Sequence, residues 1–220
     1  MSNILTIGYI TEGPTDERFL TSIIERTFTE LAFACKGVIE IFPPQHLKTT
    51  KTNFSDKVFE AATIAEERGL MVLCVHTDAD HLSDERARRH RIDPSFNKVQ
   101  TSTKDHICKN LVAIVPIQMT EAWLLADNDL FLQEIMTTDS LHDLGIASHP
   151  EQITDPKSQI KNAIQLAFQD RPRRHRQQVR LADLYGPIGQ RCDLNRLREL
   201  SSFQKFEQEI KNALQSLNLM

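Results

Sequence analysis

The chain has 220 residues, of which 40% are hydrophobic and 25% charged, a composition that predicts a globular protein with a substantial core and excludes a disordered chain. The formal net charge of -4 excludes a polycation that coats nucleic acid indiscriminately, so any nucleic-acid contact has to be local. The four cysteines lie far apart and predict neither a disulfide framework nor a zinc site. The longest apolar run, 111–117, is too short to span a bilayer and no leader is evident, so we expect a cytoplasmic protein without a membrane partner.

Apolar runs alternate with helical periodicities along the first 120 residues. Strands are predicted over 4–10, 38–42, 70–77 and 111–119. The intervening helices are predicted from Pro14 onward, over 54–68 with Gly69 as the stop, and within the polar stretch 81–110. This alternation predicts an α/β fold with a central, mostly parallel four-stranded sheet flanked by helices.

The remaining residues predict mainly helices. Helical spacing covers 121–134, 156–169 and 179–217, with a loop-rich stretch over 138–155. Gly186-Pro187 and Gly189 are expected to interrupt the last of these. We therefore divide the chain into a sheet-containing domain, 1–135, and a helical C-terminal extension, 136–220.

Carboxylates follow two of the predicted strands. Glu12 comes after the first strand, and Asp78 and Asp80 come after the third. Parallel sheets bind ligands outside the carboxyl ends of their strands, and side chains at i and i+2 share a face if the strand geometry continues. Two carboxylates about 4 Å apart repel by roughly 4 kcal/mol at an effective dielectric constant near 20, so the cluster requires a cation, a shared proton or a basic partner. Magnesium, or manganese in its place, suits such oxygen ligands, and we predict that Glu12, Asp78 and Asp80 bind it.

Two further acids are candidate metal ligands. Asp16 lies one turn after Glu12, and Glu121 follows the fourth predicted strand. Each also lies near a helix start, where the helix dipole favours a carboxylate without any metal. Asp78 and Asp80 have a similar alternative, because aspartate is favoured at N-caps.

Other residues near the acids are weaker candidates. Asp127 could approach the same crevice, and His76 or His81 could assist proton transfer near neutral pH. A histidine at a strand end is more commonly a hydrogen-bonded neighbour. We interpret Trp123 as a core anchor.

Two basic segments are candidate phosphate contacts, since Arg pairs well with phosphate oxygens. Contacts with nucleic acid are predicted at Arg86, Arg88, Arg89, Arg173, Arg174 and Arg176. The first segment could instead be a solvated helix face paired with nearby acids, and the second is also typical of a flexible basic loop.

Several of these residues resemble a known family. Glu12-Gly13-Pro14-Thr15-Asp16, followed by Phe19-Leu20, resembles the strand-one signature of Toprim domains, and Asp78-Ala79-Asp80 resembles their Asp-x-Asp motif. That resemblance covers roughly the first 120 residues. Residues 119–127 and the tail from Leu184 to Phe203 are similar to a Toprim-like family of unknown function, which extends the resemblance over nearly the whole chain.

The resemblance implies a Toprim-like Rossmannoid fold and the chemistry of the overcoming-lysogenization-defect nucleases. Glu12 matches the acid of general acid/base chemistry or metal binding, and Asp78 and Asp80 match the magnesium ligands, so these three are the expected catalytic residues. The implied function is magnesium-dependent hydrolysis of phosphodiester bonds in DNA or RNA. The family is also implied to accompany ATPases in bacterial defence loci, with this chain as the effector against phage.

Alternatives remain at this point. The chain could be a Toprim-like binding or assembly module of an ATPase complex that cuts nothing. It could be a phosphoacceptor domain with Asp78 and Thr120 in the key positions, although Asp80 and the single acid Glu12 argue against that. Topoisomerase chemistry is disfavoured because neither Tyr9, in a strand, nor Tyr185, in a distant tail, is an evident nucleophile. The sequence also leaves a homo-oligomer open.

Overall fold

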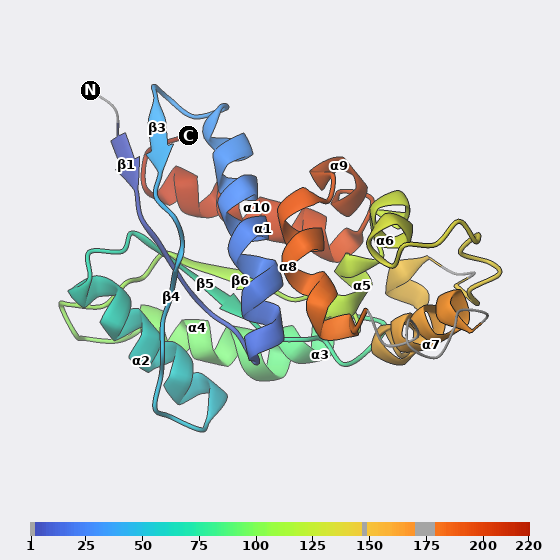
Figure 1. Cartoon of the computed structure of the whole chain (residues 1–220). Helices are drawn as coiled ribbons and strands as arrows, with labels where there is room; N and C mark the ends of the chain where they lie inside the picture. Colours follow the sequence, from blue (N-terminus) through green and yellow to red (C-terminus); the bar gives the residue numbers. More distant parts are fainter. Residues whose placement is uncertain (1–2, 147–148, 170–178) are drawn as a thin grey trace.

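The computed structural model describes residues 3–146, 149–169 and 179–220. A four-stranded sheet in the order β4-β2-β5-β6 forms the centre of the fold (Figure 1), and every neighbouring pair is parallel. Its strands are β2 (Ile7–Ile10), β4 (Gln45–His46), β5 (Val72–His76) and β6 (Leu111–Ile114). The prediction of an α/β fold with a parallel four-stranded sheet is confirmed.

The first predicted strand is in fact two strands. β1 (Asn3–Leu5) pairs with β3 (Ile39–Ile41) in a separate two-stranded sheet, and the chain changes partners at Thr6. There the Thr6 hydroxyl donates to the Gly69 carbonyl oxygen and the Thr6 carbonyl oxygen accepts from the Met71 amide, so the backbone bonds to the segment before β5. The predicted strand 38–42 therefore lies outside the four-stranded sheet, and β4 takes its expected place.

Helices cover both faces of the central sheet (Figure 1). The first half of the chain contributes α1 (Pro14–Ala32), α2 (Phe54–Glu67), α3 (Glu85–Ala87), the π-helical turn η1 (Arg88–Ile92) and α4 (Asp93–Gln100). Gly69 ends α2 with a φ of +66°, a backbone conformation that glycine adopts without steric cost, as predicted. α1 begins at Pro14, also as predicted.

The described residues of the second half are mainly helical, as predicted. Their helices are α5 (Thr120–Leu124), α6 (Asn128–Glu134), the 3-10 turn η2 (Pro150–Gln152), α7 (Pro156–Phe168), α8 (Leu181–Arg191), α9 (Leu194–Leu197) and α10 (Ser201–Ser216). The helix predicted over 121–134 is, however, divided into α5 and α6, and the stretch 179–217 is divided into α8, α9 and α10. The predicted interruption at Gly186-Pro187 and Gly189 is wrong, because α8 is continuous through all three residues.

Alternate residues of β2, β5 and β6 face two separate cores. In β5, Val72 and Cys74 pack with α1, α8 and α10, whereas Leu73 and Val75 pack with α2 and α4. Trp123 is fully buried in the first core, where its indole N–H donates to Ser202 Oγ at 2.7 Å, so it is the expected anchor. The C-terminal helices share this core with the sheet. The division at residue 135 stays a prediction, because shared packing does not by itself define domain boundaries.

Within the three described ranges, no helix combines the length and the apolar composition that a membrane crossing requires.

Candidate functional site

The register of the central sheet brings Glu12 to Asp78 and Asp80. Ile10 of β2 pairs with Val75 of β5, and the same offset sets Glu12 opposite Thr77, just beyond the strand ends. Glu12 Oε1 accepts a short hydrogen bond from the Thr77 hydroxyl. The acids from the two predicted strand ends therefore lie at one edge of the sheet.

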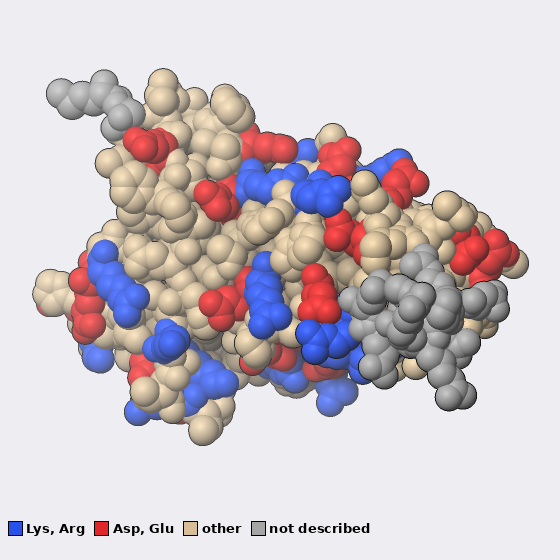
Figure 2. All heavy atoms as spheres, viewed as in Figure 1, with Lys and Arg blue, Asp and Glu red and all other residues tan. Residues whose placement is uncertain are grey.

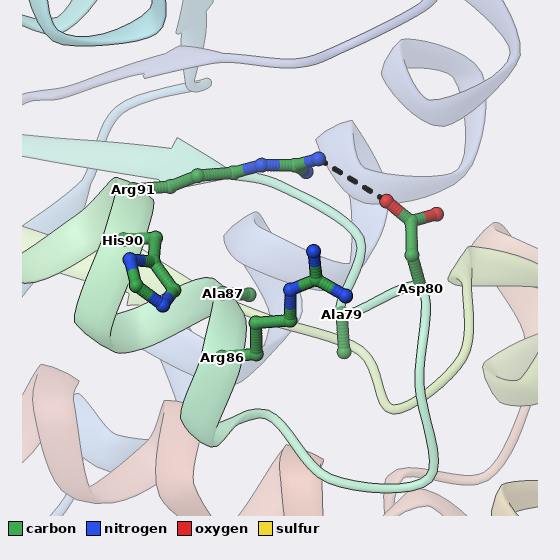
Figure 3. A pocket seen from close by; sticks show the side chains of 6 residues that line it. All are labelled: Ala79, Asp80, Arg86, Ala87, His90 and Arg91. Carbon is green, nitrogen blue, oxygen red and sulfur yellow. Dashed lines mark hydrogen bonds and ion pairs between the residues drawn. The ribbon is translucent and has the colours of Figure 1, made fainter.

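Arg91 lies between two of these acids. Its Nη1 is 3.2 Å from Glu12 Oε1, and its Nη2 is 3.3 Å from Asp80 Oδ2, the ion pair drawn in Figure 3. Nη1 also donates to Thr77 Oγ1 at 2.8 Å. The repulsion between the acids is thus relieved by a basic partner in this structure. Among the residues that the structure describes, no group of three or more His, Cys, Asp or Glu side chains is arranged to hold a metal ion.

Asp78 and Asp80 do not share a face, contrary to the expectation from strand alternation. The backbone of Asp80 is left-handed, with a φ of +53°, and its amide donates to the Gln118 carbonyl oxygen. Asp78 is directed toward the start of α5, where its Oδ1 accepts from the Thr120 amide at 2.9 Å. Backbone hydrogen bonding toward the β6 side continues through Ala79, whose amide donates to the Pro116 carbonyl oxygen, and the alternation fails at Asp80, where the backbone becomes left-handed.

His76 joins the Asp78–Thr120 group from inside the core. Its Nε2 is 3.3 Å from Asp78 Oδ1 and 3.1 Å from Thr120 Oγ1. Burial of this fully enclosed ring favours its neutral form, but the hydrogen bond and charge of Asp78, with Asp16 and Glu12 adding to them, raise the pKa of His76. Its Nδ1 is buried without a hydrogen-bond partner among the described residues. The histidine is therefore a hydrogen-bonded neighbour of Asp78.

Asp16 has the helix-start role considered for it, and its role as a metal ligand stays a prediction. Its Oδ2 accepts from the Gly13 amide at 3.0 Å, which is the helix-start role. The residue is also only 8% exposed, and its burial, together with the charges of Asp78 and Glu121, raises the pKa of Asp16 despite the attraction of His76. Asp16 thus belongs to the same charged group as Asp78.

Glu121 lies at the buried end of the site, where the C-terminal helices reach it. The Tyr185 hydroxyl of α8 donates to Glu121 Oε1 at 2.5 Å, and Lys157 Nζ of α7 is 3.0 Å from the same oxygen. Burial, followed by the hydrogen bond to Glu121, raises the pKa of Tyr185. The tail that the sequence places at a distance therefore contacts this site. The sequence contains no signal for this contact, because Tyr185 and Glu121 are 64 positions apart and belong to no common motif.

A basic pocket opens beside Asp80. The cavity has a volume of about 400 Å³ and is lined by Ala79, Asp80, Arg86, Ala87, His90 and Arg91. Figure 3 shows the Arg86 guanidinium pointing toward the side on which Arg91 and Asp80 meet. We call this cavity the arginine pocket.

The other predicted nucleic-acid contacts have different positions. Arg88 does not line the arginine pocket, because its guanidinium is held at 2.7 Å by both Asp84 and Glu209. Arg89 is exposed. The remaining predicted contacts, Arg173, Arg174 and Arg176, lie outside the described residues.

Two weaker candidates remain, of which His81 directly follows Asp80. Asp127 caps α6 through a hydrogen bond from the Leu130 amide at 3.1 Å, and its second oxygen accepts from the Asp193 amide. His81 is exposed, and its carbonyl oxygen accepts from the Gln118 amide. Asp127 therefore has a structural role.

Comparison with known proteins gives a family without an assigned activity. The model of the family described as a domain of unknown function (DUF4276) matches residues 11–211, so the chain belongs to that family. Neither the curated proteins nor the solved structures contain a significant match.

Proposed function

We propose that this member of the DUF4276 family is a magnesium-dependent nuclease that hydrolyses phosphodiester bonds in DNA or RNA. The observation that carries the proposal is the meeting of Glu12 and Asp80 around Arg91, at the carboxyl ends of two parallel strands and beside the arginine pocket. Acids in such a position suit a metal ion, and a basic pocket next to them suits the phosphate on which the ion would act.

The donor set fits magnesium chemically. Glu12, Asp78 and Asp80 offer hard carboxylate oxygens, and one oxygen of each, namely Glu12 Oε2, Asp78 Oδ2 and Asp80 Oδ1, accepts no hydrogen bond from the described residues. Glu12 and Asp80 already contact one shared positive group, the Arg91 guanidinium. Asp16 and Glu121 would be additional acids near the metal ion. Glu121 is already paired with Lys157. A bound magnesium ion supplies Lewis-acid polarisation of the scissile phosphate.

The chain's own residues suit direct attack by water. Water adds to phosphorus, the bond from phosphorus to the leaving sugar oxygen breaks, and the proton lost by the water ends on that oxygen. Arg86 and Arg91 line the arginine pocket, and there they would contact the phosphate oxygens and offset the charge that develops on them. A covalent tyrosine route is disfavoured, because the Tyr185 hydroxyl donates to Glu121 and its raised pKa keeps it protonated.

Cleavage of plasmid DNA and transfer RNA tests the proposal, with magnesium or manganese and with EDTA as the blank. We expect Glu12→Gln and Asp78→Asn to lower the rate by about 10²-fold or more, the scale of a lost catalytic group. Asp105→Asn is the matched control, since Asp105 is exposed and remote in the α4–β6 connection. Metal-dependent cleavage that survives both site variants would refute the assignment.

The second candidate is a binding or assembly module that cuts nothing. It is favoured by one observation, the Arg91 bridge, which satisfies Glu12 and Asp80 without a metal. Inactivity on both substrates with either metal, alone and with an ATPase encoded beside this chain, would support the module and end the nuclease proposal.

The ATPase partnership and the role in phage defence rest on the family resemblance alone. Co-purification with any ATPase that is encoded next to this chain tests the partnership. Plaque counts on cells that carry both genes, with wild type or Asp78→Asn, test the defence role.

A further inference from the structure

A second cavity lies on the other side of Glu12. It has a volume of about 320 Å³, and its lining includes Glu12, His46, Lys48, Phe54 and Lys57. These residues come from the turn after β2, from β4, from the segment between β4 and α2, and from the first turn of α2. It shares no lining residue with the arginine pocket, and the two cavities meet at the Glu12–Arg91 ion pair. We call it the lysine cavity.

The lysine cavity has an excess of positive charge. Within the described part of the chain, neither Lys48 nor Lys57 forms an ion pair, although Lys57 is half-buried. The one acid in the lining, Glu12, is already paired with Arg91. Lys and Arg side chains gather around the lower end of α2 and the loop before it (Figure 2). Two lysines without a carboxylate partner in one cavity suit an anionic ligand.

The lining also offers an aromatic surface. Phe54 is half-buried, packs at the edge of the α2 core and lines the cavity beside Lys57. Proteins that bind single-stranded nucleic acid combine cationic side chains, which follow the backbone, with aromatic rings on which unpaired bases stack. Phosphate binding alone would not require the ring.

We infer that a single strand of nucleic acid crosses the acidic site, with one flank of the scissile phosphate in the arginine pocket and the other in the lysine cavity. The inference rests on the proposed nuclease function and deepens it. Because both flanks are held, the strand is cut internally, which makes the enzyme an endonuclease. A duplex does not expose bases to Phe54, so the substrate is single-stranded DNA, RNA or an unpaired loop.

Binding without cleavage is the first test. The affinity for a fluorescent single-stranded DNA 12-mer is measured in EDTA for wild type and for the cavity variant Lys48→Gln/Lys57→Gln. The control is Lys36→Gln/Lys161→Gln, because both of its lysines are exposed and lie outside the cavity. We expect at least a fivefold loss of affinity in the cavity variant and a salt slope smaller by about 1.4, from two lost phosphate contacts at about 0.7 each. An affinity within twofold of wild type would overturn the inference. Thermal unfolding of each variant checks the fold.

Product analysis separates this inference from the proposed function. Circular single-stranded DNA has no ends, so only an endonuclease can linearise it. Linearisation by wild type, together with a raised KM and an unchanged kcat in the lysine variant, supports both the nuclease proposal and this inference. Cleavage that starts only at the ends of linear strands overturns the inference while the nuclease proposal stands. A loss of binding in the lysine variant without cleavage by any form supports the lysine cavity while the nuclease proposal fails.

Discussion

Arg91 controls the charge of the acidic site at the scale of single residues. Its guanidinium pairs with both Glu12 and Asp80 and offsets part of their charge, so a metal ion that bound there would have to compete with it. Each of these half-exposed ion pairs is worth about 0–1 kcal/mol. We expect Arg91→Gln to bind manganese about tenfold more tightly in the absence of substrate, as measured by calorimetry, since about 1.4 kcal/mol corresponds to a factor of ten. Arg89→Gln is the control, and an unchanged affinity in Arg91→Gln would contradict the competition.

Tyr185 tests whether the buried end of the site contributes to stability. Phenylalanine keeps the ring but removes the hydroxyl that donates to Glu121, which retains only Lys157. We expect Tyr185→Phe to lower the free energy of unfolding by about 1.5–3 kcal/mol, the range for a hydrogen bond to a charged group, in urea denaturation.

Tyr9→Phe is the matched control for that change. The Tyr9 hydroxyl is 2.6 Å from Thr21 Oγ1, so its loss removes a hydrogen bond between neutral groups, worth about 1 kcal/mol. If Tyr185→Phe cost no more than Tyr9→Phe, the charge on Glu121 would not strengthen the contact.

The sequence could predict the acids of the site but not their partners. Glu12, Asp78 and Asp80 follow apolar runs, and the pairing of parallel strands brings such positions to one edge. Arg91 stands in a run of basic residues, and the π-helical turn over Arg88–Ile92 changes the phase of the helix. Helical periodicity therefore could not indicate which arginine faces the acids.

At the scale of elements, a network of ion pairs connects the segment that carries Arg91 to α10. Asp84 is 2% exposed and lies 2.7 Å from both Arg88 Nε and Lys205 Nζ. Arg88 also binds Glu209, which like Lys205 belongs to α10. The network thus ties α3 and η1 to α10.

The pH dependence of Asp84 tests this network. Burial raises the pKa of its carboxyl, but Lys205 and Arg88 outweigh burial and bring the pKa below the ordinary 3.8. A lowered pKa adds stability above the unfolded-state value, and that stability is lost as the pH falls through the folded-state value. We expect Asp84→Asn to cost about 3 kcal/mol at pH 7, and the cost to shrink below about pH 4. Urea denaturation between pH 7 and pH 3 measures it. A cost independent of pH would contradict the role of the charge.

Two glycines of α8 allow a controlled test of how closely α8 packs on α1. A Cβ at Gly189 would lie 2.6 Å from the Phe19 carbonyl oxygen of α1, whereas one at Gly186 meets nothing within 4 Å. We expect Gly189→Ala to destabilise the fold by about 1–3 kcal/mol through overpacking. Gly186→Ala should instead be neutral or stabilising by up to about 1 kcal/mol, because alanine favours helix. Thermal unfolding measures both, and equal effects would contradict the close packing of α1 on α8.

These elements show where sequence patterns stop being informative. The α/β alternation was predictable because each helix and strand has its own period. The run from Ile4 to Ile10 is apolar on both sides of Thr6, so nothing local marks the change of partner between β1 and β2. In α8, Gly189 is required by the close contact with α1, but in the sequence it cannot be distinguished from a glycine that ends a helix.

At the scale of the whole molecule, the larger core continues across residue 135. Phe19 and Leu20 of α1 belong to the same buried cluster as Ile188 of α8 and Phe203 of α10. α8 lies along α1 in Figure 1, and Arg26 of α1 donates to the carbonyl oxygen of Cys192 at 2.6 Å. The first 135 residues alone would expose this face of α1 to water.

Burial of a large apolar side chain contributes about 1.5–3 kcal/mol, and a domain is stable by only about 5–15 kcal/mol. Exposing a few such side chains therefore removes most of the stability. We expect a fragment of residues 1–135 to lack a cooperative thermal transition, and a separately made fragment of 136–220 to restore one on mixing, in circular dichroism. The glycine variant offers the control, because Gly189→Ala in the second fragment should weaken this complementation through the α1 contact. If 1–135 unfolded cooperatively alone, the sheet and its first helices would fold independently, and the C-terminal helices would serve only to bring Tyr185 and Lys157 to Glu121.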